Sequence, residues 1–133
     1  MSGTLRSVTT DRAPAPAGHY SQAIVHGGIA YVAGQLPIDP AARGEAPGTI
    51  EQQTEQVLRN VEAVLTAAGS GLSQVLQMTV YVTDIGVWGR VNAVYARVMG
   101  AHRPARAVVP VGELHHGFAI EIQAIAAVPA PDA

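Results

Sequence analysis

The chain has 133 residues, of which 48% are hydrophobic and 14% are charged, and it contains neither cysteine nor lysine. This length fits a single domain over residues 1–133, and the low charge indicates that other copies of the chain cover part of its surface. A net charge of −2 with scattered arginines argues against nucleic-acid binding, and the lack of cysteine excludes disulfides and thiolate chemistry.

The first part of the chain predicts a flexible start and then a hairpin. Residues 1–12 are polar and show no period, so we expect them to be flexible. Apolar runs over residues 20–25 and 29–33 flank a Gly-Gly pair, which supplies the positive φ that a tight hairpin turn needs. The Gly, Pro and Ala residues that follow predict a surface loop up to Gly48.

A helix is predicted to begin at Thr49. Gln52 lies three residues further on, which is the spacing of a capping box, in which each side chain bonds the other residue's backbone N–H. Apolar residues then recur every three or four positions up to Ala68, so one side of the helix faces a core, and Gly69 ends it.

A strand and a second helix are predicted next. Apolar and polar side chains alternate over residues 75–83, the cleanest strand pattern in the chain. The helix follows over residues 84–99 and is closed by Gly100. Trp88 and Tyr95 lie on its apolar side at helical spacing, so we expect both in the core.

Two further strands are predicted, over residues 104–111 and 118–125. The first is apolar except for Arg106, and the second alternates and contains one carboxylate, Glu121. Because an unpaired buried charge is costly, each group needs a partner or a ligand. With the two segments as neighbouring strands, two interpretations stay open: a structural ion pair between Arg106 and Glu121, or a site that binds and converts an acidic ligand.

The predicted order of elements is β-β-α-β-α-β-β, which indicates an α+β domain with two helices on one face of a mixed sheet. The opposite face is too mixed for simple exposure to solvent, so we expect self-association to cover it. Residues 129–133 are expected to be flexible. No apolar stretch approaches the roughly 20 residues of a membrane helix, so we expect a cytoplasmic protein that does not bind membranes.

Seven short motifs in a fixed order give the chain a specific resemblance to a known family. They are Gly18-His19-Tyr20-Ser21-Gln22-Ala23, Ala33-Gly34-Gln35-Leu36-Pro37-Ile38-Asp39-Pro40, Gln53-Thr54 with Asn60, Ala68-Gly69, Val91-Asn92-Ala93-Val94-Tyr95, Pro104-Ala105-Arg106 and Ile120-Glu121-Ile122. On these motifs, over about residues 13–127, the chain resembles the Rid family of reactive intermediate deaminases, the YjgF-like proteins. The resemblance implies a chorismate-mutase-like fold that assembles as a homotrimer around a central barrel, with ligand clefts between subunits.

The resemblance also implies an activity without a cofactor. It is the hydrolysis of reactive enamine or imine derivatives of 2-amino acids, of the 2-aminoacrylate or 2-iminobutanoate type, to a 2-oxo acid and ammonia. By the matched motifs, Arg106 binds the carboxylate of the substrate and Glu121 positions or activates water. The substrate-binding positions carried over are Arg106, Tyr20, Asn92, Ala33, Gly34 and Ala107.

The chain departs from the family pattern at several positions. Ala33 and Ala107 stand where many members carry serine, Gln123 replaces a second carboxylate, and Leu114-His115-His116 stands where Leu-Pro is usual. Adjacent residues of a strand point to opposite faces, so the two histidines are not expected to chelate a metal ion, and we expect them at the rim of the cleft or in solvent. These departures keep an alternative open: a trimeric module that binds small carboxylates, or acts as a chaperone, without catalysis.

The chemistry of the charged pair agrees with hydrolysis of an imine. A guanidinium binds a carboxylate through two parallel hydrogen bonds, and a 2-imino acid then needs a water on one face and a proton for its nitrogen. Glu121 serves as general base if burial raises its pKa. Judged alone, Tyr20 is equally explained as a core or interface residue, and Asn92 as a partner for a neighbouring loop. RNA cleavage, sometimes attached to this family, has no support in the charge of the chain.

Overall fold

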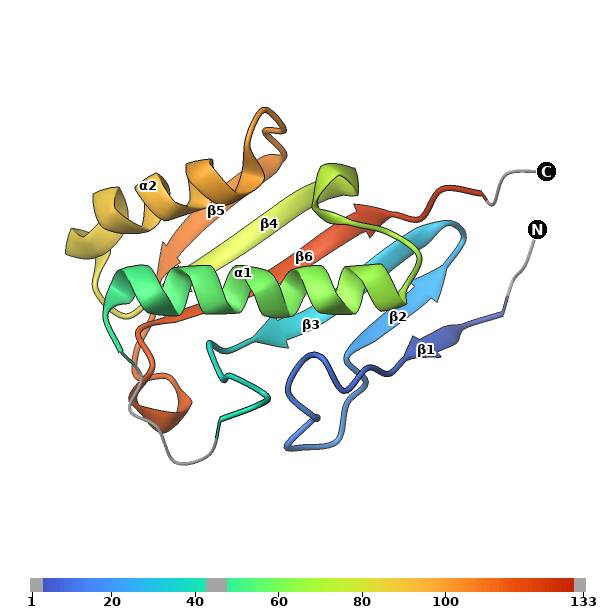
Figure 1. Cartoon of the computed structure of the whole chain (residues 1–133), viewed down its shortest axis with the longest axis horizontal. Coiled ribbons are helices and arrows are strands. Elements are labelled where there is room, and N and C mark those ends of the chain that lie inside the picture. The colour runs from blue at the N-terminus through green and yellow to red at the C-terminus, as the bar shows by residue number, and fades with distance from the viewer. Residues whose placement is uncertain (1–3, 43–47, 131–133) are drawn as a thin grey trace.

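The structure, a computed structural model, describes residues 4–42 and 48–130, so residues 43–47 of the expected loop and the outermost residues of both expected flexible ends lie outside it. Two helices lie on one face of a six-stranded sheet (Figure 1). In chain order the elements are β1 (Arg6–Val8), β2 (Ala23–His26), β3 (Ile29–Gln35), α1 (Ile50–Ala67), η1 (Leu72–Gln74), β4 (Val75–Val82), η2 (Ile85–Val87), α2 (Trp88–Met99), β5 (Ala105–Pro110), η3 (His115–Gly117) and β6 (Ile120–Ala127), where η marks a short 3-10 helix.

The order of strands in the sheet is β1-β2-β3-β6-β4-β5, so the last strand of the chain lies inside the sheet. β6 pairs antiparallel with β3 and β4, whereas β4 and β5 run parallel. The sheet is therefore mixed, and the predicted α+β fold with two helices on one face is confirmed. One expectation is wrong: β5 and β6 are consecutive in the chain but β4 separates them, so Arg106 and Glu121 do not lie on neighbouring strands.

The start of the chain is more ordered than its sequence indicated. The expectation that residues 1–12 are flexible is wrong for β1, which pairs antiparallel with β2 at the edge of the sheet. Arg6 also donates from Nη2 to the carbonyl of Ala68 at 2.9 Å. The buried side chain of Gln22 donates to the carbonyl of Thr10 at 3.0 Å and accepts the N–H of the same residue at 2.7 Å. A strand of three residues is too short to show a period, which is why the sequence pattern missed it.

The hairpin and the first helix form as predicted. Gly27 and Gly28 have φ values of 60° and 78°, which the turn between β2 and β3 requires. The Thr49 hydroxyl accepts the N–H of Gln52 at 3.1 Å, and the Gln52 side chain accepts the N–H of Thr49 at 2.9 Å. Gly69, with φ of 87°, follows the last turn of α1. The apolar side of the helix packs on the sheet and is fully buried from Val57 through Leu58, Val61, Val64 and Leu65.

The second helix begins later than predicted. The Asp84 side chain accepts the N–H of Gly86 at 2.8 Å, so the separate short helix η2 precedes α2 and Trp88 becomes the first residue of α2. At this end Trp88 is 45% exposed, and the expectation that it lies in the core is wrong. Tyr95, two turns further along, is 6% exposed, as predicted. The helix ends at Gly100, as expected, with φ of 65°.

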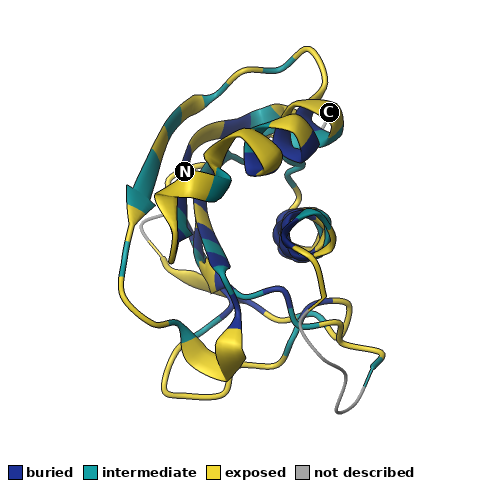
Figure 2. Cartoon of the chain, turned by 90° about the vertical axis from the view of Figure 1, so that its left-hand side faces the viewer, coloured by how far each residue is buried: buried dark blue, intermediate teal, exposed yellow. Residues whose placement is uncertain are grey.

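The face of the sheet opposite the helices carries no other element of the described chain. Figure 2 shows both helices on the same side of the sheet. On the bare side Tyr31 is 48% exposed, and the Tyr81 hydroxyl donates to Oε1 of Gln123. Whether self-association covers this face, as the sequence predicts, stays a prediction. None of the helices within residues 4–42 and 48–130 combines the length and the apolar character needed to cross a membrane.

Candidate functional site

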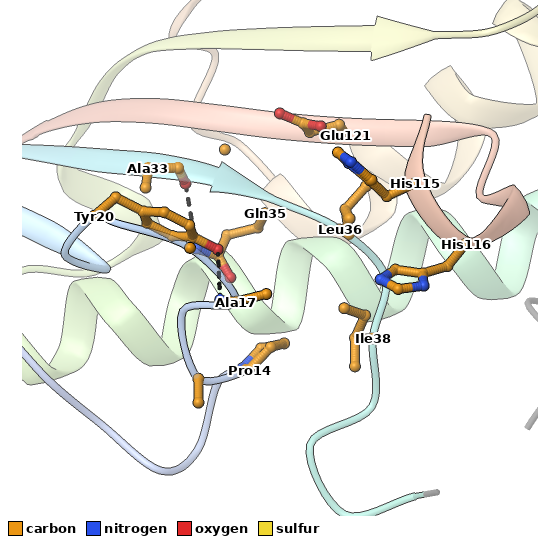
Figure 3. A pocket seen from close by; sticks show the side chains of 13 residues that line it. Pro14, Ala17, Tyr20, Ala33, Gln35, Leu36, Ile38, His115, His116 and Glu121 are labelled. Carbon is orange, nitrogen blue, oxygen red and sulfur yellow. Dashed lines mark hydrogen bonds between the residues drawn. The ribbon is translucent and has the colours of Figure 1, made fainter. Parts of the chain in front are cut away.

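A cavity of about 490 Å³ lies where the end of β3, the start of β6 and the turn η3 meet the loop before β2 (Figure 3). We call it the glutamate pocket, because Glu121 is the acid that lines it. Of the residues predicted from the sequence, Tyr20, Ala33 and Gly34 line the same pocket. The lining comes from three separate stretches of the chain, within residues 14–20, 33–38 and 115–121.

Gly34 leaves the space that the Glu121 carboxylate occupies. The register between β3 and β6 shifts between Val32 and Gln35, which marks a bulge at this point. A Cβ built on Gly34 would overlap Oε2 of Glu121. A side chain at position 34 would therefore have to displace the Glu121 carboxylate from its described position, which gives the predicted place of Gly34 in the site a steric reason.

The environment of Glu121 shifts its acidity in the direction that a general base needs. Burial raises the pKa of the Glu121 carboxyl, and the charge of His115 acts against this shift. Figure 3 shows the His115 ring beside Glu121, whereas the His116 ring points toward Ile38. Both histidines line the pocket, so the expectation that they rim a cleft is confirmed.

Two buried amides that the sequence analysis did not assign to a site hold the walls of the glutamate pocket. Asn60 of α1 donates from Nδ2 to the carbonyls of Leu36 and Ile38, at 2.9 and 2.8 Å. Oε1 of Gln53, also on α1, accepts the N–H of Ala119 at 2.8 Å, just before β6. Both polar residues are buried on the apolar side of the helix, and this interruption of the apolar pattern is the signal that could have identified them.

Tyr20 lies at the entrance of the glutamate pocket and not in the core. Its side chain is largely open, with the residue 51% exposed, and its hydroxyl accepts the N–H of Ala17 at 3.3 Å (Figure 3). This position agrees with a residue that lines a cleft or meets another subunit. Its role in binding stays a prediction.

A second cavity, of about 510 Å³, lies between α2 and β5, and we call it the arginine pocket. Nη1 of Arg106 donates to Oδ1 of Asn92 at 2.9 Å, and the guanidinium carbon lies 4.7 Å from the centre of the Tyr95 ring. Cation–π contact and one hydrogen bond fix the plane of the guanidinium and leave further N–H groups for a planar anion. The arrangement suits the binding of a carboxylate.

The hydroxyl of Tyr95 is buried in the wall of the arginine pocket. It has no hydrogen-bond partner among the described residues. Burial raises the pKa of Tyr95, and the charge of Arg106 acts against this shift. The phenol therefore stays protonated at neutral pH, and it presents a neutral ring to the guanidinium.

Within one chain Arg106 and Glu121 point to opposite faces of the sheet. Arg106 pairs with Met78 of β4, and Glu121 pairs with Tyr81 of the same strand. Directly paired residues share a face, and residues three apart on a strand lie on opposite faces. Across the sheet the two Cα atoms are two strand spacings of about 4.8 Å apart, and along the strands they are three residues of about 3.3 Å apart. Combined at right angles, these separations put the two Cα atoms about 14 Å apart.

This geometry decides between the two interpretations of the charged pair. Among the salt bridges of the described residues, none joins Arg106 to Glu121, and their positions on opposite faces prevent one. The structural ion pair is therefore excluded within a chain. Asn92 bonds the strand residue Arg106, not a neighbouring loop.

Ala107 is the predicted site residue that joins neither group. It pairs with Thr79 and lies on the bare face of the sheet, and it lines neither the glutamate nor the arginine pocket. Its part in substrate binding stays a prediction. Among the described residues, no three His, Cys, Asp or Glu side chains are grouped so that they could hold a metal ion.

Comparison with known proteins identifies what the chain is similar to. A sequence model described as endoribonuclease L-PSP matches residues 10–128. A RutC family protein of Pyrococcus horikoshii is 45% identical over 90% of this chain and 94% of its own length. The 2-iminobutanoate/2-iminopropanoate deaminase of Rattus norvegicus is 39% identical over 95% of this chain and 93% of its own. The crystal structure of a Rid family protein of Yersinia pestis superposes with a TM-score of 0.90 at 39% identity, covering 94% of this chain and all of that one.

Proposed function

The chain belongs to the endoribonuclease L-PSP family, which includes the RutC and Rid proteins, and from this premise we propose that it is a hydrolytic deaminase of small 2-imino acids. The substrates are reactive enamine or imine derivatives of 2-amino acids, of the 2-aminoacrylate or 2-iminobutanoate type. The products are a 2-oxo acid and ammonia. One relative, the rat protein, carries the name of this activity.

The observation that carries the proposal is the division of the chemistry between two pockets. The arginine pocket offers a fixed guanidinium for a carboxylate, and the glutamate pocket offers a half-buried acid whose pKa burial raises. Because the two groups lie on opposite faces, one chain cannot apply both to the same small molecule. We therefore place the reaction at a cleft between two copies, in the homotrimer that the sequence predicts.

Each group has one chemical task in this site. Arg106 binds the carboxylate of the substrate and orients the adjacent C=N carbon, which is already electrophilic. Glu121 from another copy takes a proton from water as the water oxygen attacks that carbon. Ala33 lines the glutamate pocket and adds no hydroxyl that could hold a polar substituent of the substrate.

The direct test is the decay of 2-iminobutanoate generated in solution. Wild-type protein should accelerate its hydrolysis, and both Arg106→Ala and Glu121→Ala should lower kcat/KM by about 10²-fold or more. Ala126→Gly changes a core residue that lines neither pocket, so it controls for a loss of activity caused only by a less stable fold. No acceleration by the wild type removes the enzymatic proposal, and binding of 2-oxobutanoate that depends on Arg106 would then support a module that only binds carboxylates.

A mixing experiment tests whether the site is shared between copies. Arg106→Ala and Glu121→Ala chains, each inactive alone, are unfolded and refolded together in equal amounts. If each site takes Arg106 from one copy and Glu121 from the next, random assembly leaves about a quarter of the sites intact. If one chain supplies both groups, the mixture has no intact site, and it stays inactive.

Ribonuclease activity, which the family description names, is the weaker candidate. The chain has a net charge of −2 and no lysine, so it lacks the clustered positive charge that binds a phosphate backbone. Purified protein should therefore leave single-stranded RNA intact at low salt. Cleavage that disappears in Glu121→Ala would favour the ribonuclease over the deaminase.

A further inference from the structure

His115 stands in the glutamate pocket beside the acid, at a position where it was noted from the sequence only as a departure from the family pattern. Its ring lies next to Glu121 in Figure 3, and its charge acts on the Glu121 carboxyl. In the part of the chain that the structure describes, neither side chain has a hydrogen-bond partner in the protein. Both groups are therefore free to exchange protons with a molecule in the pocket.

The backbone around His115 is fixed, so the position of the ring is set by the fold. His115 opens the short helix η3, and its carbonyl accepts the N–H of Phe118 at 3.3 Å. His116 has φ of 63°, the one positive φ of a non-glycine residue among the described residues. The Gln53 side chain then bonds the N–H of Ala119, which joins this turn to α1. The two histidine rings lie near each other in this turn, with their centres 6.1 Å apart and their planes tilted by 46°.

We propose that His115 is a second acid–base group of this site and that it protonates the departing nitrogen while Glu121 deprotonates the attacking water. This inference rests on the proposed deaminase function. An amine leaves only after protonation, because the amide anion is far too basic to be expelled. Imidazole ordinarily titrates near neutral pH, so it both gives and takes a proton under physiological conditions.

The proton movements balance without any further reactant. The water oxygen bonds to the carbon of the protonated imine, the C=N π pair moves to nitrogen, and one water proton passes to Glu121. The His115 imidazolium then gives its proton to the nitrogen of the carbinolamine. The C–N bond breaks with its electron pair on nitrogen as the hydroxyl proton passes to His115. Ammonia takes the proton from Glu121, so both side chains return to their starting states.

The other titratable groups of the pocket are less suited to this role. Besides Glu121 and His115, the described residues that line the pocket include only two titratable groups, His116 and Tyr20. The His116 ring points toward Ile38 and away from the acid, and the Tyr20 hydroxyl accepts a backbone N–H. His115 is the group whose place and chemistry both fit.

The test compares two histidine variants with the same substitution. His115→Asn should lower kcat/KM for 2-iminobutanoate by about 10²-fold and flatten the alkaline limb of its pH profile, whereas His26→Asn should stay within about threefold of wild type. His26 is exposed at the end of β2 and lines neither pocket, so the same substitution there leaves the site intact. Imidazole added to His115→Ala should restore part of the activity, which a merely structural role would not allow.

A readout independent of turnover follows the Glu121 carboxyl carbon by NMR. Because the charge of His115 opposes the shift caused by burial, His115→Asn should raise the pKa of Glu121, and His26→Asn should leave it unchanged. If the wild type is active but His115→Asn keeps its rate and pH profile, this inference is wrong and the deaminase proposal stands. If the wild type itself does not hydrolyse the imine, both fall together.

Discussion

The two pockets are built in different ways. The arginine pocket comes from one continuous stretch of chain, residues 92–106, that runs from α2 into β5. The glutamate pocket joins three stretches that lie up to about a hundred residues apart in the sequence, and two buried amides of α1 hold its walls. The first is therefore a local structure, and the second exists only once the whole sheet has formed.

This difference separates binding from chemistry. The Arg106 guanidinium is fixed by Asn92 and Tyr95 of the preceding helix, so it needs little of the rest of the fold to hold a carboxylate. An acid that must place water within a few tenths of an ångström depends on distant contacts. Changes near the glutamate pocket should thus affect kcat, and changes near the arginine pocket should affect KM. Five substitutions test this comparison of the two pockets and the charges in and around them, from the largest expected effect to the smallest.

Gly34→Ala should lower kcat for the imine by about 10²-fold, because the added methyl group displaces the Glu121 carboxylate. Affinity for 2-oxobutanoate, which depends on Arg106, should stay close to that of the wild type. Steady-state kinetics and calorimetry measure the two quantities. Gly71→Ala is the control, since a Cβ there meets no atom within 4 Å. An active Gly34→Ala variant would contradict the described position of the carboxylate.

Asn60→Ala should reduce the free energy of unfolding by about 2–3 kcal/mol, because two buried carbonyls lose their donors. Urea denaturation measures this loss. Gln56→Ala removes only a donor to Asn60 itself and should cost much less. Equal effects of the two substitutions would mean that the bonds to Leu36 and Ile38 contribute little to the fold.

Asn92→Ala should raise KM about tenfold and leave kcat nearly unchanged, since it frees the guanidinium of Arg106 without touching the glutamate pocket. Asn92→Asp sharpens the test, because a carboxylate beside Arg106 competes with the substrate and should raise KM further. Initial-rate measurements over a range of substrate concentrations give both constants. A fall in kcat alone would place Asn92 in the chemical step and contradict the assignment of substrate binding to the arginine pocket.

Glu121→Gln, which removes the proposed general base, should slightly increase stability at pH 7. Burial raises the pKa of Glu121 in the folded state, so folding costs free energy once the pH exceeds that value, and the neutral amide removes this cost. The gain should vanish below about pH 4, where the carboxyl is protonated in both states. Thermal denaturation at the two pH values measures it.

Glu51→Gln should change stability at pH 7 in the opposite direction to Glu121→Gln. Its hydrogen bond from Arg90 lowers the pKa of Glu51 to about 2, so the ionised group favours the folded state above the ordinary carboxyl pKa. That contribution is lost as the pH falls toward 2, and the substitution should reduce stability slightly at pH 7. A change in stability in the same direction for both variants would contradict the described surroundings of Glu121.

Local features of the fold were predictable from the sequence because they depend on neighbours in the chain. The capping box of Thr49 and Gln52, the Gly-Gly turn and the buried Tyr95 all follow from spacing within one or two turns. The order of strands does not, since nothing in residues 104–125 shows that β6 inserts between β3 and β4. As a result β4 separates the strands of Arg106 and Glu121, and their partners on β4, three residues apart, place the two charges on opposite faces.

The candidate site was predictable in its members but not in its arrangement. Arg106 and Glu121 were identified because each is an isolated charge in an apolar strand. The supporting amides Gln53 and Asn60 were quoted as motif residues without a role, although they interrupt an apolar helix side. His115 was expected in the connection between two strands, at the rim of a cleft or in solvent, and no sequence pattern shows that the turn η3 brings its ring beside Glu121.

The fit between Gly34 and Glu121 also bears on how such a protein changes over time. While the acid keeps its described position, a side chain at position 34 is disfavoured sterically, because even a methyl group would have to displace the carboxylate. Where a lineage loses the acid, that constraint ends and larger residues can accumulate at position 34. Among sequences that lack the acid we therefore expect residues other than glycine at position 34, a covariation that the fold alone would not reveal.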